Sequence, residues 1–311
     1  MRRILAIDGG GIRGIIAARI LVEIEKLAGQ SLAEKFDLIA GTSTGGIIAC
    51  GLGVGMPAKA LLDLYVKRGG DIFSRNLWQE IGTLDGLSGP KYDATPLESI
   101  LKDVLGDKNL SDCTTKILVP SYAIELPPPE RGPGSYFFKS WSGPNAFLRD
   151  VGRATSAAET FFAPYRFANL AGAMGAYCDG GTFADSPGAC ALADARQLWP
   201  DDQFLLVAIG TGVKVSEIPY TEMKDAGLAK WATKLPSMFM DGQGDTVNYQ
   251  LARAPGVKYF RLDAALNNGS PAMDDAEAVN CAALQRDAEA GLAKQAADLQ
   301  AITKLLGAAA V

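Results

Sequence analysis

The chain has 311 residues, of which 48% are hydrophobic, with 30 Lys and Arg residues against 35 Asp and Glu residues. This composition supplies a large hydrophobic core, and the mild negative charge without a basic block excludes binding of a nucleic-acid polymer through its phosphates. The chain has no histidine, and its five cysteines are scattered without a C-x-x-C pair, so we predict neither a metal site nor another cofactor.

The sequence shows no segment that targets or spans a membrane. No stretch approaches the ~20 consecutive apolar residues of a membrane span, and the apolar run at residues 4–7 is too short for a secretion signal. We therefore expect a soluble, cytoplasmic protein whose contact with the inner face of the membrane is peripheral. The lack of a repeat or a linker predicts a single domain over residues 1–311.

Two strand–turn–helix units open the chain. Residues 3–7 and 36–40 are short apolar runs typical of buried strands, and each is followed by glycines and then by a helix, over 12–27 and 44–52. This alternation predicts a parallel sheet covered by helices. Right-handed crossovers would place both glycine turns at the carboxyl edge of the sheet, where ligands bind in open α/β sheets.

The rest of the chain continues the alternation, so the predicted fold class is α/β. Further strands are predicted over residues 116–124, 204–209 and 257–262, with a short apolar approach over 176–178 and helices over 57–68, 95–105, 147–158, 186–198 and 285–306. Residues 95–98 read T-P-L-E, a capping box at the start of a helix. Residues 71–92 are expected to form an irregular, mobile cover, and residues 127–134 a surface loop.

The first candidate for chemistry is Ser43. It lies in G-T-S-T-G, between an apolar strand and an apolar helix, which is the layout of a nucleophile elbow. Gly41 and Gly45 suit this motif because the elbow leaves no room for side chains beside the serine. We therefore predict that Ser43 is a nucleophile.

A second motif, D-G-G-G-I-R-G at residues 8–14, can supply hydrogen-bond donors. Consecutive glycines expose backbone N–H groups in a concave turn, as an oxyanion hole requires. Asp8 is expected to buttress the turn, and Arg13 either orients it by a salt bridge or takes a direct part. The glycines through Gly14 also match G-x-G-x-x-G, but Ala40 ends the second strand where a dinucleotide site needs an acidic residue. A nucleotide- or phosphate-binding module is thus the alternative.

The absence of histidine leaves the base that activates Ser43 to be found. Asp179 follows the apolar run 176–178, and Gly180 and Gly181 would let it point toward the serine. Burial would raise the pKa of such a carboxylate and make it a better proton acceptor. Asp179 could instead merely stabilise its turn. Asp185 is the rival base, although its place beside Ser186-Pro187 suits helix capping better.

The three motifs, in this order and spacing, resemble the patatin-like phospholipases, and the likeness extends through RATSAAETFFAP (153–164) and FLLVAIGTG (204–212). The resemblance implies a three-layer α/β/α fold and a lipid acyl hydrolase that cleaves fatty-acyl esters of membrane glycerophospholipids through an acyl-enzyme. By position, Ser43 and Asp179 form a Ser–Asp dyad. The same resemblance places an oxyanion hole at the backbone N–H groups of Gly9, Gly10, Gly11 and Thr44. An acyltransferase with the same dyad is a further alternative.

The segment over residues 259–277 resembles bacterial members of this family more closely. Some of these serve in antiviral defence, where a cyclic oligonucleotide switches the lipase on. This resemblance implies a cyclic-nucleotide activator as a partner, by analogy alone.

Two apolar stretches, residues 71–87 and 223–240, are candidates for contact with the phospholipid membrane. The second combines Leu228, Trp231, Met238 and Phe239 with lysines, a composition typical of segments at a membrane interface. The alternative is that these side chains pack in the core or between copies of the chain. The sequence leaves the oligomeric state open, a homo-oligomer included.

Overall fold

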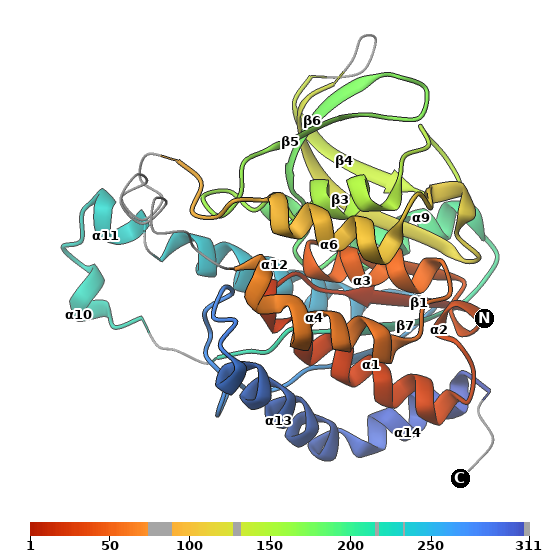
Figure 1. Ribbon diagram of the computed structural model, residues 1–311. Coiled ribbons are helices and arrows are strands. Elements are labelled where there is room, and N and C mark those ends of the chain that lie inside the picture. Colours follow the sequence, from red (N-terminus) through yellow and green to blue (C-terminus); the bar gives the residue numbers. More distant parts are fainter. Residues whose placement is uncertain (74–88, 127–131, 215–217, 233, 308–311) are drawn as a thin grey trace.

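The computed structural model describes residues 1–73, 89–126, 132–214, 218–232 and 234–307, which contain one mixed sheet (Figure 1). Its strands are β1 (Arg2–Ile7), β2 (Leu38–Gly41), β3 (Lys116–Glu125), β4 (Gly134–Lys139), β5 (Tyr165–Ala168), β6 (Met174–Asp179), β7 (Phe204–Ile209) and β8 (Val257–Leu262). Their order is β5-β6-β3-β2-β1-β7-β8, with β4 paired to β3. Strands β3, β2, β1, β7 and β8 are parallel, and the pairs made by β4, β5 and β6 are antiparallel. The predicted, mostly parallel α/β sheet is confirmed.

Helices cover both faces of the sheet, because successive side chains of a strand point to opposite faces. Leu5 and Ile7 of β1 join one hydrophobic cluster, whereas Ile4 and Ala6 join the other. The first cluster lies under α1 (Gly14–Ala28), α3 (Thr44–Gly53), α4 (Ala58–Ile72), α6 (Thr95–Leu105) and α7 (Leu148–Thr155), with α13 (Ala278–Lys294) and α14 (Ala296–Leu305) against α1. The second lies under α9 (Gly188–Leu198) and α12 (Leu235–Leu251). Figure 1 shows the resulting three layers.

Short helical segments connect these elements. They are η1 (Gly11–Arg13), α2 (Leu32–Lys35), η3 (Leu110–Asp112), α8 (Gly181–Ala184), α10 (Tyr220–Met223) and α11 (Leu228–Ala232). In the part of the chain that the structure describes, no helix has the length and apolarity needed to cross a membrane.

The predicted C-terminal helix over residues 285–306 is wrong in its extent. The structure has two helices there, α13 from Ala278 and α14 to Leu305, which meet at Gln295. Gln295 leaves the helical conformation, with φ −105° and ψ 23°, and its side-chain oxygen accepts the Asp263 N–H at 3.1 Å. Buried apolar residues continue at helical spacing across the break, so periodicity alone could not locate it.

Other local predictions also need correction. The capping box at residues 95–98 does not form: Asp93 accepts the Thr95 N–H at 3.0 Å, while Glu98 pairs with Arg153 at 3.1 Å. Strand β4 begins at the end of the predicted loop 127–134, of which residues 127–131 lie outside the described residues. Most of the predicted cover over 71–92, namely residues 74–88, also lies outside them.

Candidate active site

Ser43 lies in a sharp turn between the end of β2 and the start of α3. Its backbone has φ 54° and ψ −121°, a conformation that costs a non-glycine residue about 1–3 kcal/mol and is typical of functional sites. A side chain on Gly45 would overlap the Ile7 carbonyl group, and one on Gly41 would overlap the Gly45 carbonyl group. The structure thus has the geometry of a nucleophile elbow at the predicted position.

The glycine turn after β1 faces this elbow. Gly10 and Gly11 have φ 154° and 59°, and a side chain on Gly10 would overlap the Thr211 hydroxyl group. The backbone N–H groups of Gly10, Gly11 and Thr44 donate to no acceptor among the described residues. The Gly9 N–H, by contrast, donates to the Asp185 carbonyl oxygen at 3.0 Å. Three of the four predicted oxyanion donors are therefore free to bind a substrate oxygen, and Gly9 is not.

Asp179 ends β6, and its side chain is 5% exposed. Its Oδ1 accepts the Gly181 N–H at 2.7 Å, whereas Oδ2 is buried and has no hydrogen-bond partner among the described residues. Burial raises the pKa of Asp179 to about 7, although the Gly181 N–H and the neighbouring Ser43 hydroxyl group each lower it. A carboxylate with this pKa accepts a proton more readily than an ordinary one near neutral pH.

The C-terminal end of α7 bonds to both turns. The Thr155 hydroxyl group accepts the Ser43 N–H at 3.0 Å and donates to the Pro120 carbonyl oxygen at 2.6 Å. The Asp179 N–H donates to the Ala157 carbonyl oxygen at 3.0 Å. One short segment therefore fixes the position of Ser43 relative to Asp179.

Asp185 does not cap α9, as its position in the sequence suggested: Pro187 is at the N-cap of that helix, without a side-chain bond. The Asp185 carboxyl group instead lies against Gly9 and Gly181. The backbone N–H of Asp185 donates to the side-chain oxygen of Gln243 at 3.2 Å. Burial and then the carboxylates of Asp8 and Asp179 raise the pKa of Asp185 well above its usual value. Asp185 lines the same cavity as Ser43 and stays the rival of Asp179 for the role of the base.

A cavity of about 550 Å³ joins these groups. Ser43 and Asp179 line it together with Gly10, Gly11, Thr44 and Asp185. The rest of its wall is mainly apolar and includes Ile47, Tyr65, Leu97, Phe161, Phe162 and Met273. Such a wall suits a hydrocarbon chain, which would lie next to the hydroxyl group and the carboxyl group.

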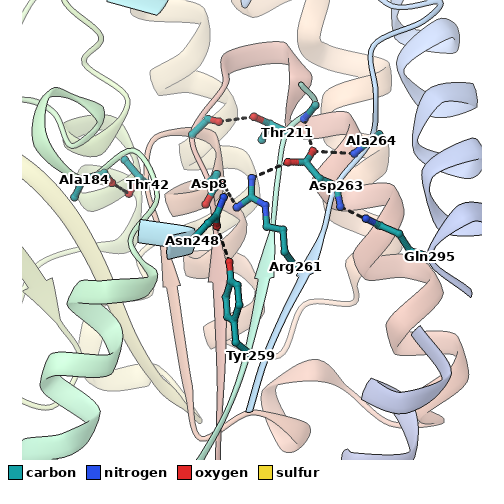
Figure 2. Close-up of polar contacts among 12 residues, drawn as sticks. Asp8, Thr42, Ala184, Thr211, Asn248, Tyr259, Arg261, Asp263, Ala264 and Gln295 are labelled. Atoms are coloured by element: carbon teal, nitrogen blue, oxygen red, sulfur yellow. Dashed lines mark hydrogen bonds and ion pairs between the residues drawn. The ribbon is translucent and has the colours of Figure 1, made fainter. Parts of the chain in front are cut away.

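The turn rests on side chains that sequence reasoning missed (Figure 2). Arg261 of β8 pairs with Asp8 and Asp263, and Thr211 donates to the Gly9 carbonyl oxygen at 2.5 Å. A charged residue inside an otherwise apolar strand, Y-F-R-L, was the available signal for Arg261. Asp8 does buttress the turn.

The other residues of the D-G-G-G-I-R-G motif have packing roles. Arg13 forms no salt bridge within the described residues, and its guanidinium group donates to the Gly10 and Gly212 carbonyl oxygens, both at 3.4 Å. A side chain on Gly14 would overlap the Thr44 hydroxyl group, so this glycine lets α1 approach the elbow. In the described ranges no group of three or more Cys, Asp and Glu side chains is arranged to hold a metal ion.

Similarity to known proteins identifies a family of lipid-ester hydrolases. The sequence profile of the patatin-like phospholipase family matches residues 5–189, and the chain belongs to this family. It is 32% identical to a cGAMP-activated phospholipase from Pseudomonas aeruginosa, over 84% of this chain and 77% of that protein. It is 31% identical to patatin-like protein 2 from Oryza sativa subsp. indica, over 86% and 75% of the two chains. It is also 31% identical to calcium-independent phospholipase A2-gamma from Rattus norvegicus, over 86% of this chain and 36% of that protein.

Proposed function

We propose that this protein is a phospholipase of the A type, which releases fatty acids from membrane glycerophospholipids through a Ser43–Asp179 dyad. The observation that carries this proposal is the shared apolar cavity, in which a strained serine, a buried carboxyl group and free backbone N–H groups meet. A dyad without histidine requires a carboxylate that is a good base at neutral pH, and the pKa of about 7 for Asp179 meets that requirement.

The proposed reaction has two halves. Asp179 Oδ2 takes the proton of the Ser43 hydroxyl group as Oγ attacks the acyl carbonyl carbon. The N–H groups of Gly10, Gly11 and Thr44 bind the resulting oxyanion, and Asp179 then returns the proton to the leaving lysophospholipid oxygen. In the second half Asp179 takes a proton from water as the water oxygen attacks the acyl carbonyl carbon of the acyl-enzyme. The bond from this carbon to Ser43 Oγ then breaks, Asp179 returns the proton to Oγ, and the fatty acid leaves.

The proposal is tested by fatty-acid release from mixed phospholipid vesicles, with the Ser43→Ala variant as the blank. Product analysis in the presence of lysophospholipid separates hydrolysis from acyl transfer, because a transferase would yield a new diacyl lipid in place of free fatty acid. The nucleotide-binding alternative has weaker support, because the free N–H groups of the glycine turn face a mainly apolar cavity. Release equal to the blank would overturn the proposed activity.

We further propose that α10, α11 and α12 contact the membrane surface. Tyr220, Leu228 and Phe239 are 78%, 83% and 62% exposed, and Phe239 also lines the cavity. Lys224, Lys230 and Lys234 are interspersed among them, as in helices that bind anionic lipid. These exposed apolar side chains would bring the mouth of the cavity to the acyl chains of the bilayer.

Replacing Tyr220 and Leu228 together by serine is expected to lower activity on anionic vesicles by about tenfold, because two apolar side chains no longer enter the bilayer. Hydrolysis of a soluble ester should be unchanged, since neither side chain lines the cavity. The matched control is Val279→Ser on α13, which removes a side chain of similar exposure, 79%, outside these three helices. Equal losses on vesicles and on the soluble ester would contradict the membrane role.

A cyclic nucleotide is the proposed activator, and antiviral defence the proposed setting, because a relative 32% identical to this chain is a cGAMP-activated phospholipase. Vesicle hydrolysis measured with cyclic GMP–AMP, with other cyclic di- and trinucleotides and without nucleotide tests this. An effector with ordinary coupling would raise the rate about 5- to 150-fold. A rate that no member of the panel changes would contradict this regulation and leave the hydrolase proposal standing.

A further inference from the structure

An arginine of the edge strand β8 reaches the start of the glycine turn across the neighbouring strand. In the sheet register Arg261 is level with Ala208 of β7, which is level with Ala6 of β1. Alanine at both positions leaves a path for the long side chain over this face. Arg261 Nη1 lies 2.5 Å from Asp8 Oδ2, and Nη2 lies 2.7 Å from Asp263 Oδ2 (Figure 2).

The same cluster bonds the turns that follow three adjacent parallel strands. Asp263, after β8, accepts the Gly212 N–H at 2.9 Å, in the turn after β7. Thr211 of that turn donates to the Gly9 carbonyl oxygen in the turn after β1. The Asp263 N–H donates to Gln295, at the junction of α13 and α14 (Figure 2). A continuous set of bonds therefore runs from the C-terminal helices to the glycine turn.

We propose that Arg261 is a positioning residue for the oxyanion site: its two ion pairs hold the glycine turn so that the Gly10 and Gly11 N–H groups point at the ester oxygen. This inference rests on the proposed function. Arg261 is not among the residues that line the cavity, so we expect it not to contact a substrate bound there. We therefore expect loss of Arg261 to lower the rate of the chemical step, because a misplacement of about 1 Å in the reacting geometry can cost about 100-fold in rate.

Removing the guanidinium group also gives a distinctive dependence on pH. Asp8 faces Arg261, Asp263 and Ser186, and its carboxylate acts on Asp185 and Tyr259. Burial raises the pKa of Asp8, and Arg261 offsets part of that rise. Without Arg261 the carboxyl group would be neutral at low pH and ionise at higher pH, where its charge would oppose the oxyanion. The wild type and the variant should both gain activity as Asp179 ionises, but the variant should lose activity again at higher pH, where Asp8 ionises.

The experiment measures kcat and KM for p-nitrophenyl butyrate from pH 5 to 10, per active site titrated with a fluorophosphonate. Arg261→Met is expected to lower kcat about 10- to 100-fold with KM within about twofold of the wild type, and to lose further activity at alkaline pH. Asp8→Asn in the Arg261→Met background should abolish that alkaline loss. Arg261→Lys keeps the positive charge but has one nitrogen in place of the two that pair with Asp8 and Asp263, so it should give an intermediate kcat.

Arg253→Met is the matched control, because Arg253 is exposed and lies over the Tyr249 ring, outside the cluster. Its kcat should equal that of the wild type. An unchanged kcat per titrated site in Arg261→Met, or an alkaline loss that persists in the double variant, would overturn the inference. If Arg261→Met does not fold, Arg261→Lys decides: a kcat equal to the wild type would overturn it. A wild type that cleaves no ester and titrates no serine would overturn the proposed function as well.

Discussion

Replacing Ser43 by alanine is expected to abolish fatty-acid release, by at least about 10³-fold, and to abolish labelling by a fluorophosphonate. The reason is that the acyl-enzyme needs Oγ, and free N–H groups alone supply only the residual rate. The backbone at residue 43 keeps φ 54°, so the variant retains the strained turn and should stay folded. Release assays on vesicles and gel fluorescence of the labelled protein measure the two effects.

A second serine of the same cavity provides the matched control. Ser156 lines the cavity, is 7% exposed, and its hydroxyl group has no hydrogen-bond partner within the described part of the chain. Ser156→Ala should keep both activity and labelling, because Ser156 does not lie in the elbow. Labelling that persists in Ser43→Ala and disappears in Ser156→Ala would show that Ser156, and not Ser43, is the nucleophile.

The Asp179→Asn variant should lose about 10⁴-fold in turnover, because an amide cannot take the proton of the Ser43 hydroxyl group. In the wild type, kcat/KM should rise with pH and level off above about 7, since burial raises the pKa of Asp179 to about 7 and only the ionised form is a base. The pH profile on a soluble ester measures this limb. Full activity in the Asp179→Asn variant would contradict the role of Asp179 and leave Asp185 as the candidate base.

Burial of Asp179 also makes the free energy of unfolding depend on pH, in the direction opposite to that for a salt-bridged carboxylate. The pKa of Asp179 is higher in the folded than in the unfolded chain, so the unfolded chain releases this proton first as the pH rises from about 4. The group therefore lowers the free energy of unfolding progressively between about pH 4 and about pH 7, and the full loss remains above that range. Asp179→Asn should therefore unfold at a higher temperature than the wild type at pH 8, as measured by calorimetry. Glu159→Gln is the control for the pH profile, because the charge of Glu159 raises the pKa of Asp179. This change should keep turnover and should move the rise of kcat/KM to lower pH.

Features encoded over short stretches were predictable from the sequence. The elbow around Ser43 depends on a strand, two small residues and a helix that are contiguous in the chain. The parallel topology followed from alternating strands and helices, and it places the turns after β1 and β2 at one edge. Asp179 is the last residue of the antiparallel strand β6, and it pairs with Ser121 of β3. The pairing of β2 with β3 ends earlier, at Leu118, so Asp179 lies beyond the end of β2, at that same edge.

Features that depend on distant partners were not predictable in the same way. The Gly9 N–H donates to the Asp185 carbonyl oxygen, 176 positions away in the chain. The glycine motif alone therefore predicted one backbone donor too many for the oxyanion hole. Arg261 contacts Asp8 across a strand, at a register position where β7 and β1 both have alanine, Ala208 and Ala6. At the break between α13 and α14, the Gln295 side chain accepts a hydrogen bond from Asp263, 32 positions earlier in the chain. The spacing of apolar residues within the helices gives no sign of this bond.

The bonds of Thr155 and Ala157 fix the backbone positions of Ser43 and Asp179 relative to each other, and so would set the distance between the two members of the proposed dyad. Thr155 and Ala157 do not line the cavity themselves, and they lie outside the C-terminal helices, so side chains of α6 and of those helices can change while these bonds stay the same. Homologous chains could thus acquire new lipid preferences by replacing wall segments such as α6. Among the described residues, the Thr155 hydroxyl group is the acceptor of the Ser43 N–H, so the position of the proposed nucleophile depends on this one threonine.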